Sequence, residues 1–138
     1  MQLPDNTPEH KIFRETLQAF IRKEILPHVD TWEREGAIDK AIWKKLGDMG
    51  FMGLNFPTAY GGMDLDFYYT AIFCEELSKC FSGGFTIAAL VTQFMATPYL
   101  GQYGSEALKD KFLKPCIAGD ALAAIAITEP WAGSDIGS

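Results

Sequence analysis

The sequence has no cluster of basic residues, and basic side chains are fewer than acidic ones. Lysine and arginine number 12 against 18 aspartates and glutamates, which leaves a formal net charge of −6 and a pI of about 4.8. Proteins that bind a phosphate backbone concentrate Lys and Arg on one face. The sequence therefore predicts that nucleic acid is not a partner.

Long hydrophobic runs are also missing. The longest uninterrupted apolar stretch runs from Ala121 to Ile127, whereas a membrane-spanning helix needs about 20 apolar residues. Residues 1–5 have neither the basic start nor the apolar stretch of a secretory signal. We therefore expect no membrane span and a cytoplasmic location, or an organelle that is reached after processing.

Cysteine and histidine are scarce. The three cysteines (Cys74, Cys80 and Cys116) cannot all pair, and they lack the spacing of a metal site, so we expect buried free thiols. His10 and His28 fall on a helix and its continuation, where they are expected to face solvent. The sequence predicts no metal site.

Local catalytic signatures are absent as well. The chain contains no G-x-G-x-x-G, no Walker loop, no H-E-x-x-H and no G-x-S-x-G. Neighbouring carboxylates such as Glu75 and Glu76 are assigned to charged helix faces, because adjacent helix positions do not face one another. No residue of this sequence is predicted to be catalytic.

Apolar residues at helical spacing are abundant. They make up 48% of the chain against 22% charged residues, a balance typical of a folded domain. Thr7-Pro8 predicts a helix start, after which Phe13, Leu17 and Phe20 share a packed face and Arg14 lies on the solvated one.

Pro27 predicts an interruption near Leu26 before the helix resumes towards Glu35 and stops at Gly36. Further helices are expected from Asp39 to Gly50, from Asp66 to Ser82 and from Ser105 to Phe112, the last ending before Pro115.

Two segments are apolar on all sides. Residues 85–99 have no charged face, which predicts a buried helix. Residues 121–128 are too short for a typical helix and are closed by Glu129-Pro130, which predicts a buried strand. This strand would have no partner in the sequence, so we expect a β-domain to continue beyond Ser138. The expected division is a helical domain over 1–119 and the start of a second domain over 120–138.

The segment after this strand combines small and hydroxylated residues in a tight turn, a composition suited to a polar heterocycle or a phosphate. An ordinary surface loop is the alternative. Its sequence, Ile127-Thr128-Glu129-Pro130-x-Ala132-Gly133-Ser134-Asp135, resembles the flavin-contacting signature of the acyl-CoA dehydrogenase family. Trp131 is a departure, since the family most often has glycine there. Two further stretches resemble family hallmarks in matching order: Pro57-x-x-Tyr60-Gly61-Gly62, and Tyr103-Gly104-Ser105-Glu106 followed by Lys111-Phe112-Leu113.

The resemblance implies an all-α fold, namely the N-terminal helical bundle domain of the acyl-CoA dehydrogenase type with one trailing strand from the following β-domain. FAD would lie between the domains. The implied reaction is dehydrogenation of an acyl-CoA thioester at Cα–Cβ with hydride transfer to FAD. An electron-accepting flavoprotein would be the partner, and the intact protein would be a homo-oligomer. The catalytic base would lie in a C-terminal domain outside this sequence, so the chain alone is expected to be inactive.

The resemblance also implies site residues. Those expected to bind the cofactor are Ala126, Ile127, Thr128, Gly133 and Ser134. Those expected to bind the substrate are Ile87, Leu90 and Phe94, which would line the acyl pocket, and Ser134 beside the thioester. For the three apolar residues, core packing is the alternative.

Two other functions remain open at this point. One is a stand-alone helical interaction module that has lost flavin chemistry. The other is a fragment of a flavin oxidase or monooxygenase with the same fold, because the residues before Ser138 do not fix the reaction type.

Overall fold

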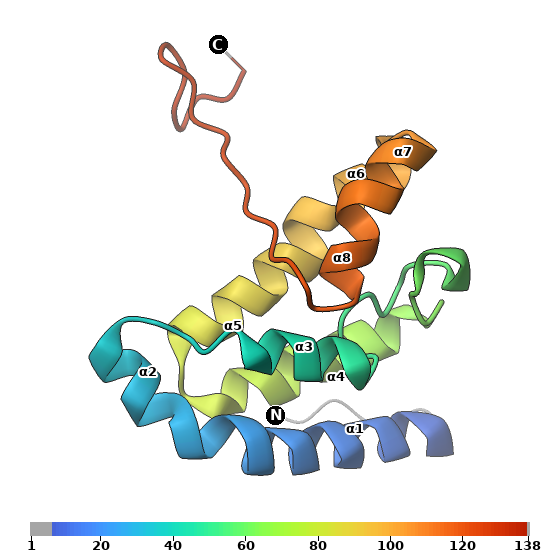
Figure 1. The fold of residues 1–138 in the computed structure, drawn as a ribbon, viewed down its shortest axis with the longest axis vertical. Helices are drawn as coiled ribbons and strands as arrows, with labels where there is room; N and C mark the ends of the chain where they lie inside the picture. The colour runs from blue at the N-terminus through green and yellow to red at the C-terminus, as the bar shows by residue number, and fades with distance from the viewer. Residues whose placement is uncertain (1–6, 138) are drawn as a thin grey trace.

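A computed structural model describes residues 7–137, and the regular elements in that range are all helical (Figure 1). The first long run consists of α1 (Pro8–Phe20), η1 (Ile21–Ile25), η2 (Leu26–His28) and α2 (Val29–Glu35). The second consists of α5 (Gly83–Leu90), η5 (Val91–Ala96) and α6 (Thr97–Tyr103), and the third of α7 (Glu106–Leu108), η6 (Lys109–Leu113) and α8 (Lys114–Ile117). Between the first two lie α3 (Ala41–Asp48), η3 (Thr58–Tyr60), α4 (Phe67–Leu77) and η4 (Ser78–Cys80).

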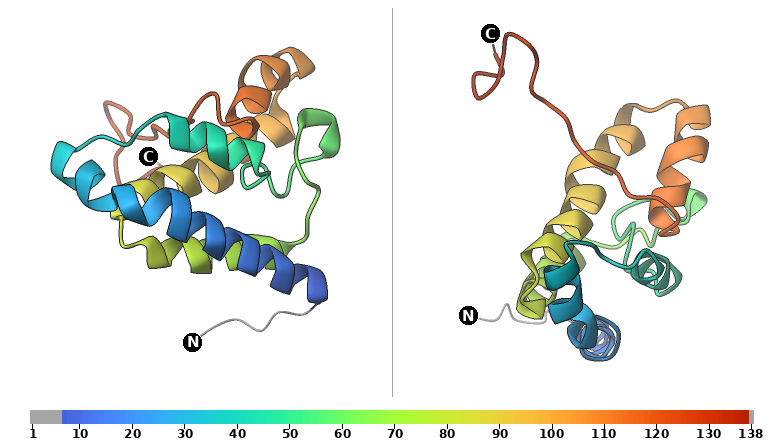
Figure 2. Two further views of the ribbon diagram at one scale, coloured as in Figure 1. Left: turned by 60° about the horizontal axis from the view of Figure 1, so that its bottom comes forward. Right: turned by 60° about the vertical axis from the view of Figure 1, so that its left-hand side comes forward.

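The helices form a bundle with a protruding hairpin. Helices α1 and α4 pack side by side, and α6 packs against η6 so that the second and third runs form an antiparallel hairpin (Figures 1 and 2). Residues 121–137 then leave the bundle as a chain without regular structure. Over the described range, no helix has both the length and the apolar character that a bilayer crossing requires.

Three of the four predicted helix starts are confirmed by their caps, whereas α3 begins at Ala41 with Lys40, not the expected Asp39, as its N-cap. The Thr7 hydroxyl accepts a hydrogen bond from the His10 N–H at 3.3 Å, and the Asp66 carboxylate accepts one from the Tyr68 N–H at 2.8 Å. Ser105 caps α7 in the same way. These side chains replace the missing partners of the first-turn amides, so the start of each helix is fixed locally.

Each long run contains a π-helical segment that ends two residues before a proline: Pro27, Pro98 and Pro115. Proline lacks an N–H, and its ring clashes with the carbonyl four residues earlier in an α-helix. The residue before each proline donates to the carbonyl five residues earlier, namely Leu26 to Ile21, Thr97 to Thr92 and Lys114 to Lys109. The wider turn lets the helix pass the proline. The predicted helix end before Pro115 is therefore wrong, while the predicted interruption at Pro27 takes the form of a single 3-10 turn.

The predicted buried strand over 121–128 is also wrong for the described chain. No strand is present in residues 7–137, and most of 121–128 is exposed. A strand is defined by hydrogen bonds to a neighbour, and no other described segment pairs with this one. The helix expected over 85–99 is present but longer, and it is buried on one side only, with Ile87 60% and Tyr99 62% exposed.

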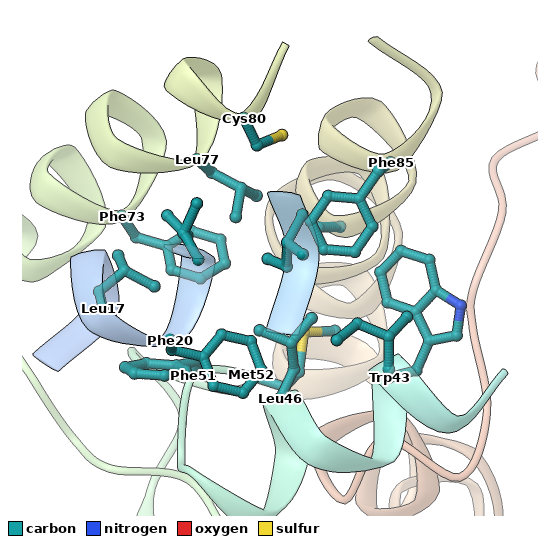
Figure 3. Close-up of a cluster of buried hydrophobic side chains, with 14 of the residues drawn as sticks. Leu17, Phe20, Trp43, Leu46, Phe51, Met52, Phe73, Leu77, Cys80 and Phe85 are labelled. Atoms are coloured by element: carbon teal, nitrogen blue, oxygen red, sulfur yellow. The ribbon is translucent and has the colours of Figure 1, made fainter. Parts of the chain in front are cut away.

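The core lies between α1, α3, α4 and the start of α5 (Figure 3). Leu17, Leu46 and Phe73 are fully buried there. The Phe85 ring stacks on Trp43 with centroids 5.0 Å apart, which joins α5 to α3. Burial of such side chains is the main stabilising contribution to the bundle.

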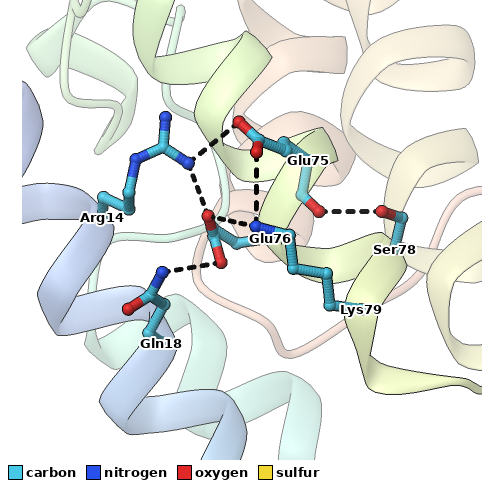
Figure 4. Close-up of polar contacts among 6 residues, drawn as sticks. All are labelled: Arg14, Gln18, Glu75, Glu76, Ser78 and Lys79. Atoms are coloured by element: carbon cyan, nitrogen blue, oxygen red, sulfur yellow. Dashed lines mark hydrogen bonds and ion pairs between the residues drawn. The ribbon is translucent and has the colours of Figure 1, made fainter. Parts of the chain in front are cut away.

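A buried charged cluster joins α1 to α4 (Figure 4). Arg14 and Glu76 are 3% and 2% exposed and form an ion pair, so the prediction that Arg14 is solvated and Glu76 lies on an exposed helix face is wrong. Gln18 donates to Glu76 at 3.0 Å, and Lys79 donates to it at 2.8 Å. Buried charges are tolerated when they are paired and hydrogen-bonded in this way.

His10 corrects a second surface assignment. Its side chain is 3% exposed, its Nε2 lies 3.3 Å from the Asp66 carboxylate, and its ring packs against Tyr69 at a centroid distance of 4.4 Å. The three cysteines are free thiols as predicted, with Cys80 and Cys116 buried and Cys74 half-buried.

Candidate functional site

The predicted acyl-pocket residues lie on one helical run, α5 with η5. Leu90 and Phe94 are half-buried and pack against the core, where the Phe94 ring meets Phe73 at a centroid distance of 6.1 Å and an angle of 78°. Ile87 faces outward. Leu90 and Phe94 thus pack in the core, which was the alternative role for them. Their contribution to an acyl pocket stays a prediction.

The predicted flavin-contacting residues lie on the segment that leaves the bundle. Ala126, Ile127, Thr128, Gly133 and Ser134 are all exposed. The turn between them is closed by two backbone bonds, from the Glu129 N–H to the Ala132 carbonyl at 2.8 Å and from the Ala132 N–H to the Glu129 carbonyl at 3.3 Å. Residues 129–137 stand away from α5 in Figure 1 and in the right-hand view of Figure 2. The structure therefore does not bring this turn together with Ile87, Leu90 and Phe94.

The chemistry of these exposed groups fits one side of a flavin site. Within the described range, no hydrogen bond uses the Thr128 or Ser134 hydroxyl. A Cβ built on Gly133 would meet no atom within 4 Å, so a ligand has open access to its backbone. Hydroxyls beside accessible amides suit the heteroatoms of an isoalloxazine ring or a diphosphate.

Two buried polar residues of η5 were not singled out by sequence reasoning. The Gln93 side-chain oxygen accepts hydrogen bonds from the N–H groups of Gly53 and Leu54, and the Thr92 hydroxyl donates to the Ala123 carbonyl at 3.1 Å. Gln93 thus binds the loop at residues 53–54, and its neighbour Thr92 binds the segment that leaves the bundle. The available signal was their polarity within an otherwise apolar helix, because a polar side chain in a buried helix needs a partner.

The two other family-like motifs contact each other through Tyr60 and Glu106. The Tyr60 hydroxyl lies 3.0 Å from the Glu106 carboxylate, and the Lys109 amine lies 3.0 Å from Glu106 and 3.2 Å from Tyr60. Hydrogen bonds from Lys109 and Tyr60 lower the pKa of Glu106. A Cβ on Gly62 would lie 2.1 Å from the Phe56 carbonyl oxygen, so only glycine fits there. These motifs hold the 51–62 loop against the third run.

Glu76, the carboxylate of the buried cluster, does not have the character of a poised general base. Burial acts to raise the pKa of Glu76, but hydrogen bonds from Lys79, Arg14 and Gln18 outweigh it, and the pKa lies below its ordinary value. A base that removes a carbon-bound proton needs a raised pKa. Within residues 7–137 there is also no group of three His, Cys, Asp or Glu residues able to hold a metal ion.

Comparison with known proteins identifies the family. Residues 7–120 match the family model described as acyl-CoA dehydrogenase, N-terminal domain. The chain is 38% identical over 130 residues to the long-chain specific acyl-CoA dehydrogenase, mitochondrial, of Sus scrofa, covering 93% of this chain and 29% of that protein.

Solved structures agree with the sequence match. The acyl-CoA dehydrogenase from Geobacillus kaustophilus superimposes with a TM-score of 0.86 at 38% identity, over 94% of this chain and 34% of that one. An acyl-CoA dehydrogenase complexed with FAD from Bacillus anthracis gives 0.81 at 32% identity, over 96% and 22%. The chain thus spans about three tenths of the length of the mammalian relative. It belongs to the acyl-CoA dehydrogenase family, a family of flavoproteins, and corresponds to its N-terminal part.

Proposed function

We propose that this chain is the N-terminal part of a flavoprotein oxidoreductase that dehydrogenates an acyl-CoA between Cα and Cβ. The observation that carries the proposal is the exposed segment 126–134, whose hydroxyls and open glycine backbone are not used within the described fold. The structural relative complexed with FAD supports the choice of cofactor. When bound, FAD would supply the acceptor for the hydride that leaves Cβ.

The residues of the segment have distinct roles in this proposal. The backbone of Ala126 and Ile127 and the hydroxyl of Thr128 bind the flavin ring. Gly133 allows the close approach of a ligand to the backbone, and the Ser134 hydroxyl contacts the flavin or the thioester. Hydroxyls and amides of this kind fix a polar ligand by direction, which is how a small number of polar groups gives a site its specificity.

The acyl chain would lie along the outward side of α5 and η5. Ile87 is exposed, and Leu90 and Phe94 are half-buried, so an apolar chain can remove apolar surface from water there. Exclusion of water from such a wall also strengthens the electrostatic contacts made at the reacting end of the substrate.

The remaining parts of the reaction lie outside these residues. The proposal places the catalytic base in a C-terminal domain beyond this sequence, so the chain alone is inactive. Removal of two hydrogens leaves two electrons that need an acceptor, for which we propose an electron-accepting flavoprotein. The intact enzyme is proposed to be a homo-oligomer in the cytoplasm.

The test is to sequence the gene beyond codon 138 and to assay the extended protein. It is supplied with FAD, a series of acyl-CoA thioesters and an artificial electron acceptor, and the 138-residue chain is assayed in parallel. We expect turnover by the extended protein and none by the chain alone. Turnover by the chain alone, a stop codon directly after Ser138, or an extended protein that oxidises other substrates but no acyl-CoA overturns the proposal.

Variants of the extended protein test the assigned residues. Thr128→Val and Ser134→Ala each remove one hydroxyl, so FAD should bind about three- to tenfold more weakly, the range that the net contribution of one hydrogen bond allows. Thr16→Val is the matched control, because the Thr16 hydroxyl is exposed and donates only within its own helix, to the Ile12 carbonyl at 2.8 Å. Unchanged FAD affinity in both site variants contradicts the assignment.

A further inference from the structure

The segment that carries the proposed flavin contacts is attached to the bundle at a small number of points. The Lys44 amine lies 3.7 Å from the Asp120 carboxylate, and the Ala121 N–H donates to the Pro115 carbonyl at 3.2 Å. Next along the chain, the Thr92 hydroxyl donates to the Ala123 carbonyl at 3.1 Å. Among the described residues, no hydrogen bond joins 124–128 to the bundle. Ala123 is therefore the last hydrogen-bonded point before Ala126.

Thr92 is a rigid anchor for this contact. Its side chain is 1% exposed, and its carbonyl accepts hydrogen bonds from both the N–H and the hydroxyl of Thr97, the latter at 2.6 Å. The neighbouring Gln93 is tied to the 53–54 loop. A β-branched side chain has restricted rotation about χ1, and burial of Thr92 together with its hydrogen bond to Ala123 selects one of the rotamers open to a helical threonine.

Thr92 also belongs to the helical run that carries the proposed acyl wall. It lies between Leu90 and Phe94 in the sequence, and both of these pack against the core. A shift of residue 123 relative to Thr92 therefore changes the position of residues 126–128 relative to the wall. Among the residues that the structure describes, the bond from Thr92 to Ala123 is the hydrogen bond that connects the two halves of the proposed site.

We propose that Thr92 is a positioning residue of the proposed site: its hydroxyl holds Ala123 and so directs the flavin-contacting residues 126–128 relative to Ile87, Leu90 and Phe94. This inference rests on the proposed function for its consequence, but the contact itself is a property of this chain. Thr92 touches neither cofactor nor substrate in the proposal. It acts through the chain segment that it fixes.

The test compares three variants of the 138-residue chain. Thr92→Val keeps the shape and removes the hydroxyl, whereas Thr92→Ser keeps the hydroxyl. Thr86→Val is the matched control, because Thr86 lies on α5 and its hydroxyl donates to the Leu77 carbonyl at 3.3 Å, away from the departing segment. NMR order parameters of residues 122–124 are the first readout, and the second is the FAD affinity of the extended protein carrying the same substitutions, from the quenching of flavin fluorescence.

We expect Thr92→Val to lower the order parameters of residues 122–124 from about 0.85, typical of rigid backbone, to below about 0.6. FAD affinity should fall about three- to tenfold in the same variant. Thr92→Ser and Thr86→Val should match the unmodified chain in both readouts. Order parameters that stay unchanged in Thr92→Val, or that fall equally in Thr86→Val, overturn the proposal.

Failure of the proposed function gives a different result. If none of the four extended proteins binds FAD, that outcome counts against the proposed flavin site, while the order parameters of the 138-residue chain still decide whether Thr92 holds the segment. If FAD binds equally to all four while Thr92→Val loosens the segment, Thr92 is a structural tie and its positioning role is overturned.

Discussion

At the scale of single residues, the buried ion pair between Arg14 and Glu76 is expected to contribute to stability. Replacement of Glu76 by Gln leaves the 3%-exposed Arg14 guanidinium short of negative charge and turns an amide NH₂ towards other donors. Loss of one partner of a buried pair is strongly destabilising, and because Glu75 still lies 2.9 Å from Arg14 we expect a loss of about 2–4 kcal/mol. Urea denaturation followed by circular dichroism measures the change.

The matched control for that substitution is Glu15→Gln. Glu15 is 62% exposed, and its carboxylate lies 3.9 Å from the amine of Lys11, which is 67% exposed. Exposed pairs of this kind contribute little, so the free energy of unfolding should change by less than about 1 kcal/mol. Equal urea midpoints for the two variants contradict a stabilising role for the buried pair.

Glu76 also makes the free energy of unfolding depend on pH. The pKa of Glu76 lies below its ordinary value of 4.5, because burial acts to raise it but hydrogen bonds from Lys79, Arg14 and Gln18 outweigh burial. A depressed folded-state pKa contributes stability that is present above the unfolded-state pKa and is lost as the pH falls through the folded-state pKa. The difference in unfolding free energy between the unmodified chain and Glu76→Gln should therefore be full at pH 7 and shrink below pH 4.5. A difference that stays constant from pH 7 to pH 3 rules this out.

At the scale of elements, a π-helical segment followed by a proline can leave a helix carbonyl without its usual N–H donors. In η5 the Thr97 N–H is committed to Thr92, and Pro98 has no N–H, so the Gln93 carbonyl lacks its usual donors. The Thr97 hydroxyl lies 3.2 Å from it and shares its one proton between this carbonyl and the nearer Thr92 carbonyl at 2.6 Å. Thr97→Val should leave a buried carbonyl unsatisfied and lower the unfolding free energy by about 1–3 kcal/mol. Thr97→Ser should recover most of that loss in the same urea titration, and a serine variant as unstable as the valine one contradicts the argument.

Comparison of the predicted elements with the observed ones shows how much of the fold could be predicted from the sequence. Helix starts at Thr7, Asp66 and Ser105 were predictable because caps act within three residues. The continuation past Pro115 was not, because the wider turn depends on a bond pattern with no local signature. The burial of Arg14 and His10 depends on residues about sixty positions away on α4, which periodicity within α1 cannot indicate. For the candidate site, the sequence pointed to residues 126–134 through their resemblance to a family motif, but the contact between Thr92 and Ala123 was visible only in the fold.

At the scale of the whole molecule, the second helical run carries large apolar side chains on its outer side. Ile87, Met95, Tyr99 and Tyr103 are between 47% and 74% exposed. Exposed apolar groups gathered on one element mark a surface that binds a partner, a ligand or another domain. Because a stand-alone interaction module is expected to be monodisperse in isolation, the solution behaviour of the chain tests that alternative against the proposed enzyme part.

The exposed run predicts the behaviour of the isolated chain. We expect it to bind a hydrophobic dye and to show a sedimentation coefficient that rises with protein concentration. Ile87→Glu should lower both effects, because it places a charge on the apolar surface. Ile12→Glu on α1 is the matched control, since Ile12 is 62% exposed against 60% for Ile87 and undergoes the same change of charge. If Ile12→Glu lowers dye binding as much as Ile87→Glu does, the surface along α5 and α6 is not the one responsible. If the unmodified chain sediments as a monomer at all concentrations and binds no dye, the interaction module becomes the better account of this chain.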